Sequence, residues 1–344
     1  MPIEFTYDRP DVNARKIING ADQDVVQLEP MKHTFAWDYY NTGNANHWLP
    51  TEIGMQKDVE QWKSPTALTE DERHAFETVL GFFTTADSIA ANNIVMAFYG
   101  HITSPECRLY LLRQAYEEAI HTHAYQYMVE SLGLDSGRIF NMYREHEEIY
   151  DKASFIVTFN EGVFNKDFQT GDFESDQKFL ENLCVAALVL EGIFFYSAFA
   201  VILALQQQNK MVGSAEQIQY IMRDESNHLN FGIDLINTVK EEQPELWTED
   251  FQQRILDIIN EAVDIESNFA ASAFPKGIMG MNADGFRQYV EHIADRRLNR
   301  IGLPSQYNVN NPFPWMSEAI DLAKEKNFFE TRVTEYQVGG TLDW

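Results

Sequence analysis

The chain carries little positive charge. Its 344 residues hold 26 lysines and arginines against 53 aspartates and glutamates, so the formal net charge is −27. Nucleic acids and anionic membranes bind basic surfaces, and this balance argues against both as partners. It also argues against a polyphosphate site, although a local pocket can escape the field of the whole chain.

Cysteine is scarce as well. Cys107 and Cys184 are the two cysteines, and both fall in predicted helices. We expect them to be small core residues rather than a disulfide pair, which is typical of a reducing compartment. The N-terminal residues MPIEFTYDRP lack a basic stretch followed by an apolar one, so no signal peptide is expected. These features predict a cytoplasmic protein.

Alternating strand patterns, internal repeats and low-complexity tracts are absent from the sequence. Apolar positions instead recur with helical spacing, and the predicted helices cover residues 70–100, 105–132, 137–160, 176–208, 215–241, 249–274, 284–300 and 315–328. We expect Ser175 or Asp176 to cap helix 176–208, and Ser214 with Gln217 to form a capping box for helix 215–241. The predicted fold is all-α, with an irregular N-terminal arm at 1–50, one helical bundle domain at 51–328 and a flexible tail at 329–344.

Only one long hydrophobic run stands out. It covers Leu183–Leu205, where 22 of 23 positions are uncharged and Glu191 is the exception. A helix of this length spans about 34 Å, and because it is apolar on every side it needs a bilayer or the centre of a large helical protein. The run lacks the flanking Lys/Arg asymmetry that orients membrane spans, which favours a buried central helix. A carboxylate there is costly unless something neutralises it.

Further ionisable residues fall on the apolar faces of three other predicted helices. Helices 105–132 and 215–241 each place a Glu-x-x-His pair on the inward face, because residues three apart share one side of a helix. Helix 70–100 adds one inward carboxylate, and Glu191 adds another. This combination is the ligand pattern of ferritin-like dimetal carboxylate proteins. The predicted ligands are Asp87, Glu118, His121, Glu191, Glu225 and His228.

Charge counting supports two metal ions at this set. Four carboxylates carry −4 and two divalent ions carry +4, so the buried site comes close to neutral. The alternative is a core of acid–histidine pairs without metal, but no lysine or arginine lies on those stripes to balance the acids. Oxygen and imidazole ligands suit iron or manganese. With neither cysteine nor methionine among the ligands, copper and iron–sulfur clusters are disfavoured.

Tyr125 lies one turn beyond His121 on the same face. A core tyrosine is usually only packing, but beside a dimetal site that dioxygen can oxidise, a phenol is an electron donor. Three apolar residues, Phe195, Phe199 and Ile221, fall on faces that can wall the same pocket. Such a wall would exclude water and slow the quenching of a phenoxyl radical.

The same residues sit in motifs that resemble a known family. The motifs are Ala86–Ser88 (ADS) followed by Asn92-Asn93, Tyr116–His121 (YEEAIH), Leu190–Gly192 (LEG), Arg223–His228 (RDESNH) and Glu335–Gly340 (EYQVGG). Together they resemble the small, radical-generating subunit of class I ribonucleotide reductase, from the Trp48 region to the C-terminus. The resemblance implies a ferritin-like helical homodimer that works with a catalytic large subunit.

Carried over position by position, the resemblance makes the six predicted ligands metal ligands and Tyr125 the radical tyrosine. It implies that Trp48, Asp224 and the tail residue Tyr336 relay the radical, and that the three apolar residues above form the radical pocket. Asp224 also precedes the ligand Glu225. We expect it to bond the second nitrogen of His121, as metal-bound histidines commonly require, and to connect onward to Trp48.

Residues 92–95 and 121–123 are similar to a chlamydial-type branch of the family. That branch resembles a manganese–iron version with phenylalanine at the radical position and glutamate as the first ligand, whereas this chain has Tyr125 and Asp87. We therefore predict a tyrosyl radical. A di-iron site is favoured, with Mn/Fe and Mn/Mn as the alternatives.

The predicted function is to generate an oxidant from the metals and dioxygen and to pass it to the large subunit, which reduces ribonucleotides. The acidic tail with Tyr336 is expected to dock on that partner. One alternative is another dimetal oxidase of the same fold, a desaturase or a ligand-binding oxidase, which would need an acyl-chain cavity and no redox tail. A ferritin-type iron store is the other, but such chains are usually a single short four-helix bundle.

Overall fold

The computed structural model describes residues 11–20, 27–278 and 281–317. These residues form helices, and no β-strand occurs among them. The predicted tail with Tyr336, and residues 318–328 of the last predicted helix, lie outside the described residues. The α-helices are α1 (Thr34–Ala45), α2 (Gln56–Lys63), α3 (Glu70–Asn93), α4 (Tyr99–His101), α5 (Pro105–Leu132), α6 (Ser136–Phe140), α7 (Met142–Glu145), α8 (Glu147–Glu161), α9 (Phe173–Cys184), α10 (Phe195–Gln206), α11 (Val212–Glu242), α12 (Glu249–Ala273) and α13 (Ala283–Arg300).

Local signals set the ends of the long helices. Thr69 and Glu72 form a capping box at the start of α3, in which each side chain accepts the other's backbone N–H. Gly133 ends α5 with φ 70°, a left-handed conformation that glycine adopts without steric cost. Two stretches are π-helical: η3 (Ile94–Phe98), which follows α3, and η4 (Val185–Phe194), which joins α9 to α10.

The long apolar helix lies at the centre of the bundle, as predicted. It runs without a break over Phe173–Gln206 and is long and apolar enough to cross a membrane, but its most apolar window is entirely buried inside the protein. Its predicted cap is wrong. Asp172 accepts hydrogen bonds from the backbone N–H groups of Glu174 and Ser175, so α9 begins earlier than a cap at Ser175 or Asp176 would allow.

The prediction that residues 1–50 are irregular is wrong over the length of α1. This helix packs against α5 and α11, and Ala36 and Gly43 are buried in it. A Cβ on Gly43 would come within 2.7 Å of Glu117 Oε1, so the glycine lets the two helices approach closely. Tertiary packing of this kind forms helices that local sequence does not signal.

The single helix predicted at 137–160 is also wrong. The chain forms α6, α7 and α8, with breaks at Asn141 and His146. The bends place the side chain of Met142 against α3, where a Cβ on Gly81 would lie 2.5 Å from Met142 Sδ. The contact between a methionine and a glycine of another helix decides the path of the chain here.

A fourth correction concerns the start of α11. The predicted capping box of Ser214 and Gln217 does not form, because the buried carboxylate of Asp58 on α2 takes the cap position. Asp58 accepts from the backbone N–H groups of Gly213 and Ser214 at 2.9 and 2.7 Å, and from the Ser214 hydroxyl at 2.7 Å. The helix begins at Val212. A distant residue thus satisfies two N–H groups of its first turn, and these bonds hold α2 against α11.

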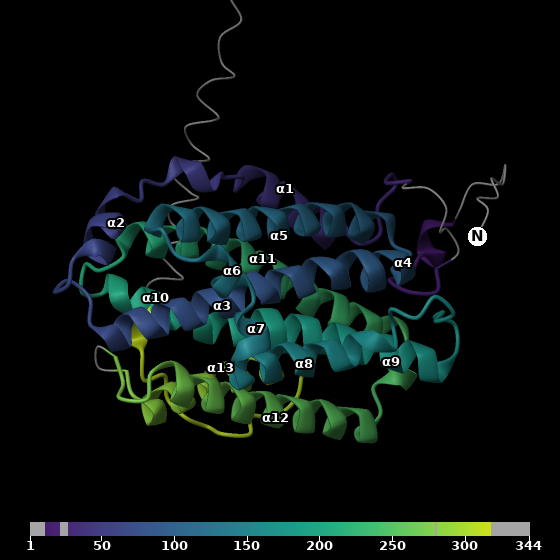
Figure 1. Cartoon of the computed structure of the whole chain (residues 1–344). Helices are drawn as coiled ribbons and strands as arrows, with labels where there is room; N and C mark the ends of the chain where they lie inside the picture. The colour runs from purple at the N-terminus through teal and green to yellow at the C-terminus, as the bar shows by residue number, and fades with distance from the viewer. Residues whose placement is uncertain (1–10, 21–26, 279–280, 318–344) are drawn as a thin grey trace, which may run out of the picture.

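The helices form layers around the central one (Figure 1). α1 and α5 lie along one side, and α12 and α13 pack together on the opposite side. Between them, α3 contacts α5, α10 and η4, and α11 likewise contacts α5, α10 and η4. The four elements that carry the predicted ligands, α3, α5, η4 and α11, are therefore neighbours.

One ion pair is buried in this core. Lys152 Nζ on α8 lies 2.7 Å from Glu266 Oε2 on α12, and neither side chain is exposed. The ammonium also lies 3.5 Å from the centre of the Phe82 ring and 4.0 Å from that of Phe269. Burial lowers the pKa of Lys152 to about 8 and raises that of Glu266. Each charge thus depends on the other.

We expect Glu266→Gln to lower the free energy of unfolding by about 3 kcal/mol or more, because it leaves a buried ammonium without its counterion. The double variant Lys152→Met/Glu266→Met should recover most of that loss, since replacing both charges by apolar groups is often close to neutral. Urea unfolding at pH 7 measures both. If the single and double variants lose the same free energy of unfolding, the two charges do not depend on each other.

Candidate metal centre

Four elements carry the six predicted ligands into one buried region. Asp87 lies on α3, Glu191 on η4, and α5 and α11 each carry one Glu-x-x-His pair. Every one of these side chains is buried. The structure therefore brings all six together, although they are spread over more than 140 positions of the sequence.

The ligand atoms form two overlapping groups. One group is Asp87, Glu118, His121 and Glu225, and the other is Glu118, Glu191, Glu225 and His228. Within each group the atoms lie within 4.8 Å of one another, and Glu118 and Glu225 belong to both. Two carboxylates shared between two four-atom groups are what a pair of bridged metal ions requires.

His121 faces the first group with one ring nitrogen. Its Nδ1 lies 3.1 Å from Asp87 Oδ1 and 3.1 Å from Glu225 Oε1. Its Nε2 lies 3.4 Å from Asp224 Oδ2 on the other side of the ring. A proton on Nε2, donated to Asp224, leaves the Nδ1 lone pair for a metal, and the expected bond between these two residues is present.

His228 repeats this arrangement in the second group. Its Nδ1 lies 3.3 Å from both Glu118 Oε1 and Glu225 Oε2. Its Nε2 lies 2.8 Å from Glu117 Oε2, and Arg113 holds the other oxygen of Glu117 at 3.1 Å. Both histidines thus present the same nitrogen to the carboxylates, and each is oriented by an acid that is not itself in either group.

Burial and charge perturb the pKa values of the whole set. Burial raises the pKa of Asp87 to about 8, and it raises that of Glu191 well above its usual range. Burial opposes ionisation of Glu118 too, but contacts with both histidines lower its pKa to about 2. The pKa values of His121 and His228 rise well above the usual range despite burial, because carboxylates surround them.

Several polar atoms at this centre have no hydrogen-bond partner among the described residues. They are Asp87 Oδ2, both carboxylate oxygens of Glu118 and Glu225, and His228 Nδ1. Buried polar atoms normally have partners, so an unsatisfied set in one place indicates a missing ion. Carboxylate and imidazole donors suit iron and manganese, and the residues present fit two such ions.

A chain of contacts leads from His121 toward the N-terminal part of the protein. Asp224 Oδ2, which faces His121, also accepts a 2.8 Å hydrogen bond from Trp48 Nε1. Trp48 is 4% exposed, and its ring stacks on Tyr220 with centres 5.3 Å apart. The three residues expected to connect here, His121, Asp224 and Trp48, are in series.

Tyr125 is fully buried, and its hydroxyl has no hydrogen-bond partner among the described residues. Burial, and secondarily the charge of Asp87, holds the pKa of this phenol well above its usual range. Its ring stacks on Phe83 with centres 5.2 Å apart and planes within 5°. Phe83 in turn contacts Phe195 and Phe199, so these two expected pocket residues reach the phenol through Phe83. Ile221 is buried on α11, one turn before Glu225.

Comparison with known families decides the class of this centre. The family described as "Ribonucleotide reductase, small chain" matches residues 25–312. The chain belongs to this family. It is a small subunit of ribonucleoside-diphosphate reductase, an oxidoreductase, and its buried carboxylate and histidine side chains could hold metal ions. The desaturase and iron-store alternatives are set aside.

The similarity to other ribonucleotide reductase subunits extends over nearly the whole chain. Over 336 residues it is 52% identical to the ribonucleoside-diphosphate reductase subunit beta of Chlamydia pneumoniae, covering 98% of this chain and 97% of that one. The R2 subunit from Clostridium botulinum superimposes with a TM-score of 0.84 at 27% identity, covering 93% and 98%. The Rnr4 homodimer from Saccharomyces cerevisiae superimposes with a TM-score of 0.70 at 25% identity, and the match covers 90% of this chain and 89% of that one. The predicted ferritin-like fold and the chlamydial-type resemblance are both confirmed.

Sequence reasoning missed four residues of this reductase centre. Phe83 lies four positions before Asp87, and Gln114 lies four before Glu118, so helical spacing alone could have found both. Gln114 donates a 2.8 Å hydrogen bond to Glu191 Oε1. Glu117 and Tyr220 carry no such signal. Glu117 is one of many acids on α5, and Tyr220 gains its position only from the packing of Trp48 on α11.

Proposed function

We propose that the six buried ligands hold two metal ions and that the chain supplies a stored one-electron oxidant for ribonucleotide reduction. The observation that carries this is the pair of ligand groups that share Glu118 and Glu225. A di-iron pair is favoured, with Mn/Fe or Mn/Mn as alternatives. When bound, the ions would supply, with dioxygen, the oxidising power that the protein side chains lack.

The cavity that touches the ligands is small. It has a volume of about 10 Å³ and touches Glu191 and His228. That is room for about one water-sized molecule. An acyl chain, which a desaturase must hold next to its metals, does not fit this cavity.

In this proposal Tyr125 is the residue that stores the oxidising equivalent. It loses one electron together with its hydroxyl proton, because the oxidised phenol would otherwise be a strongly acidic, buried cation. We assign the proton to Asp87, the acid with the largest charge effect on Tyr125, whose Oδ2 also lacks a partner. Phe83, Phe195 and Phe199 keep water and reductants from the phenoxyl oxygen.

The relay that we propose runs outward through His121, Asp224 and Trp48, which are joined by the 3.4 and 2.8 Å contacts described above. The tail residue Tyr336 would carry the equivalent onward to the large subunit, with residues 329–344 as the docking segment. Tail and docking lie outside the described residues and rest on the family resemblance. The net charge of −27 and the burial of both cysteines fit a chain that delivers an oxidant and leaves the nucleotide to its partner.

We also propose a homodimer. Four large apolar side chains are about half exposed on two packed elements: Val95 and Met96 on η3, and Leu112 and Tyr116 on α5. Such a group of exposed apolar residues marks a protein contact, and the yeast relative is described as a homodimer. A cytoplasmic location is proposed on the two buried free cysteines.

The relay predicts a separation of function in Trp48→Phe. This variant removes the indole N–H that Asp224 accepts, so we expect the tyrosyl radical to form normally while deoxyribonucleotide formation with the large subunit is lost. Electron paramagnetic resonance and product assays on the same sample measure the two. Trp62→Phe on α2 is the matched control and should retain both. Normal turnover in Trp48→Phe would rule out this route.

A further inference from the structure

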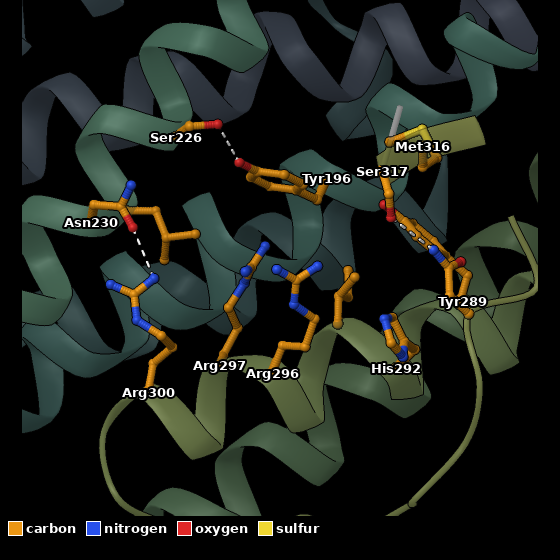
Figure 2. A pocket seen from close by; sticks show the side chains of 13 residues that line it. Tyr196, Ser226, Asn230, Tyr289, His292, Arg296, Arg297, Arg300, Met316 and Ser317 are labelled. Carbon is orange, nitrogen blue, oxygen red and sulfur yellow. Dashed lines mark hydrogen bonds between the residues drawn. The ribbon is translucent and has the colours of Figure 1, made fainter. Parts of the chain in front are cut away.

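A second pocket lies between α13 and the helices α10 and α11 (Figure 2). We call it the arginine pocket, because Arg296, Arg297 and Arg300 of α13 line it together with His292. Its volume is about 120 Å³. Acids make up 53 of the 344 residues, yet none of the 13 residues that line this pocket is an aspartate or glutamate. A cationic pocket in so acidic a chain calls for a physical explanation.

Arg297 is the central cation. It is only 7% exposed, its Nε donates a 2.9 Å hydrogen bond to the carbonyl of Gly192, and its guanidinium lies 4.7 Å from the centre of the Tyr196 ring. Within the described residues, its two Nη groups have neither a hydrogen bond nor an acidic partner. The neighbouring Asp295 does not help, because its carboxylate accepts from the backbone N–H groups of residues 306–308.

The other two arginines point into the same space. Figure 2 shows the side chains of Arg296 and Arg297 rising together from α13 toward Tyr196. Arg300 donates to Asn230 Oδ1 at 2.9 Å, and Arg296 has no hydrogen bond or ion pair among the described residues. Three guanidinium groups held this close repel one another, and a buried one is costly without a counterion. An anion in the pocket would remove both costs.

The chemistry of the pocket selects the kind of anion. Arginine presents paired N–H donors that match the oxygens of a phosphate or carboxylate. The enclosed volume admits a single phosphoryl group, and a larger molecule would have to extend from it into solvent. The net charge argues against a polyphosphate site, but a local pocket can escape the field of the whole chain, because its own lining sets the field inside it.

Two contacts connect this pocket to the metal centre. Arg297 holds the carbonyl of Gly192, the residue after the ligand Glu191, within the π-helical stretch η4. Tyr196 donates to Ser226, the residue after the ligand Glu225; the donor is Tyr196 because the Ser226 hydroxyl is already given to the Met222 carbonyl. The pocket therefore contacts the residue that follows each of two ligands, at the backbone of Gly192 and at the side chain of Ser226.

We propose that the arginine pocket binds a phosphate-class oxyanion and that Arg297 transmits its occupancy to the backbone that positions Glu191. Arg297 is a positioning residue in this scheme, and its effect on the metals rests on the function proposed above. The ligand is inorganic phosphate or the terminal phosphate of a nucleotide, which share the same recognition chemistry.

Binding is tested by calorimetric titration of inorganic phosphate, and separately ADP, into the metal-free full-length protein at constant ionic strength. We expect saturable binding that Arg296→Gln/Arg300→Gln weakens by about tenfold or more, since each removes charged hydrogen bonds. Arg287→Gln is the matched control. Arg287 lies on α13 but pairs with Asp264 at 2.9 Å outside the pocket, so this variant should bind phosphate as tightly as the wild type. Tighter binding of ADP than of phosphate would assign the nucleotide. The proposal is overturned if the wild type shows no saturable phosphate binding. It is also overturned if Arg296→Gln/Arg300→Gln binds phosphate as tightly as Arg287→Gln does.

Coupling is tested by Mn²⁺ binding, followed by electron paramagnetic resonance with and without saturating phosphate. We expect phosphate to change the Mn²⁺ affinity by about fivefold or more in the wild type and in Arg287→Gln. Arg297→Lys keeps the positive charge but loses the Nε contact to Gly192, so phosphate should not change its Mn²⁺ affinity. A protein that binds phosphate but no Mn²⁺ would refute the metal site and leave the anion site intact. Mn²⁺ binding that phosphate does not alter would refute the coupling.

Discussion

Tyr125→Phe will abolish the organic radical and the activity with the large subunit while both metal ions stay bound. The phenol is fully buried, has no hydrogen-bond partner among the described residues, and stacks on Phe83. Removing one oxygen from such a site leaves the packing intact and takes away the group that can lose a proton and an electron. The measurement is electron paramagnetic resonance after exposure to dioxygen, with metal content determined on the same sample.

Tyr127→Phe provides the control for this experiment. Tyr127 lies on the same helix, two positions further on, and its hydroxyl donates to the carbonyl of Ile53 instead of facing the metal ligands. We expect the radical spectrum and the activity of this variant to match the wild type. An unchanged spectrum in Tyr125→Phe, or a lost one in Tyr127→Phe, would place the stored oxidant elsewhere.

Glu225→Ala will remove both metal ions, because this carboxylate belongs to both ligand groups. Removing a residue that merely orients a ligand typically costs 10- to 100-fold in metal affinity, so losing a shared ligand should cost more than about 100-fold at each position. Glu191→Ala removes a ligand of one group only. We expect that variant to keep the ion held by Asp87 and His121.

Glu241→Ala is the matched control on the same helix, since Glu241 is an exposed acid near the end of α11. Equilibrium dialysis followed by elemental analysis counts the ions per chain in all three variants. Loss of a single ion from Glu225→Ala would mean that the two groups are not bridged. Retention of both ions by Glu191→Ala would remove that residue from the ligand set.

The sequence carried most of the information for the metal centre. A Glu-x-x-His pair on the inward face of a helix gives both the ligand types and the side on which they lie. Periodicity alone finds two such pairs and two further inward carboxylates, Asp87 and Glu191. The pattern could not show that Glu118 and Glu225 are shared between two groups. It also could not find Glu117, which reaches His228 only because α5 and α11 pack side by side.

For the fold as well, the sequence could not predict contacts between segments that lie far apart along the chain. Asp58 caps a helix that begins more than 150 residues later. Helix α1 forms in a stretch marked only by scattered aromatics, with prolines on either side. The contact of Met142 with Gly81 breaks a stretch that reads as one helix. In each case the local sequence was compatible with the outcome, but the deciding partner came from another element. The buried ion pair of Lys152 and Glu266 could not be foreseen for the same reason.

The most direct measurement for the whole account is a reconstitution. The full-length protein is loaded with iron or manganese, exposed to dioxygen and mixed with a ribonucleotide reductase large subunit, a ribonucleoside diphosphate and a dithiol reductant. We predict deoxyribonucleotide formation that requires both chains and disappears in Tyr125→Phe. Metal-loaded protein that forms no product with large subunits of chlamydial-type or other origin, and whose tail peptide does not bind them, would contradict the account.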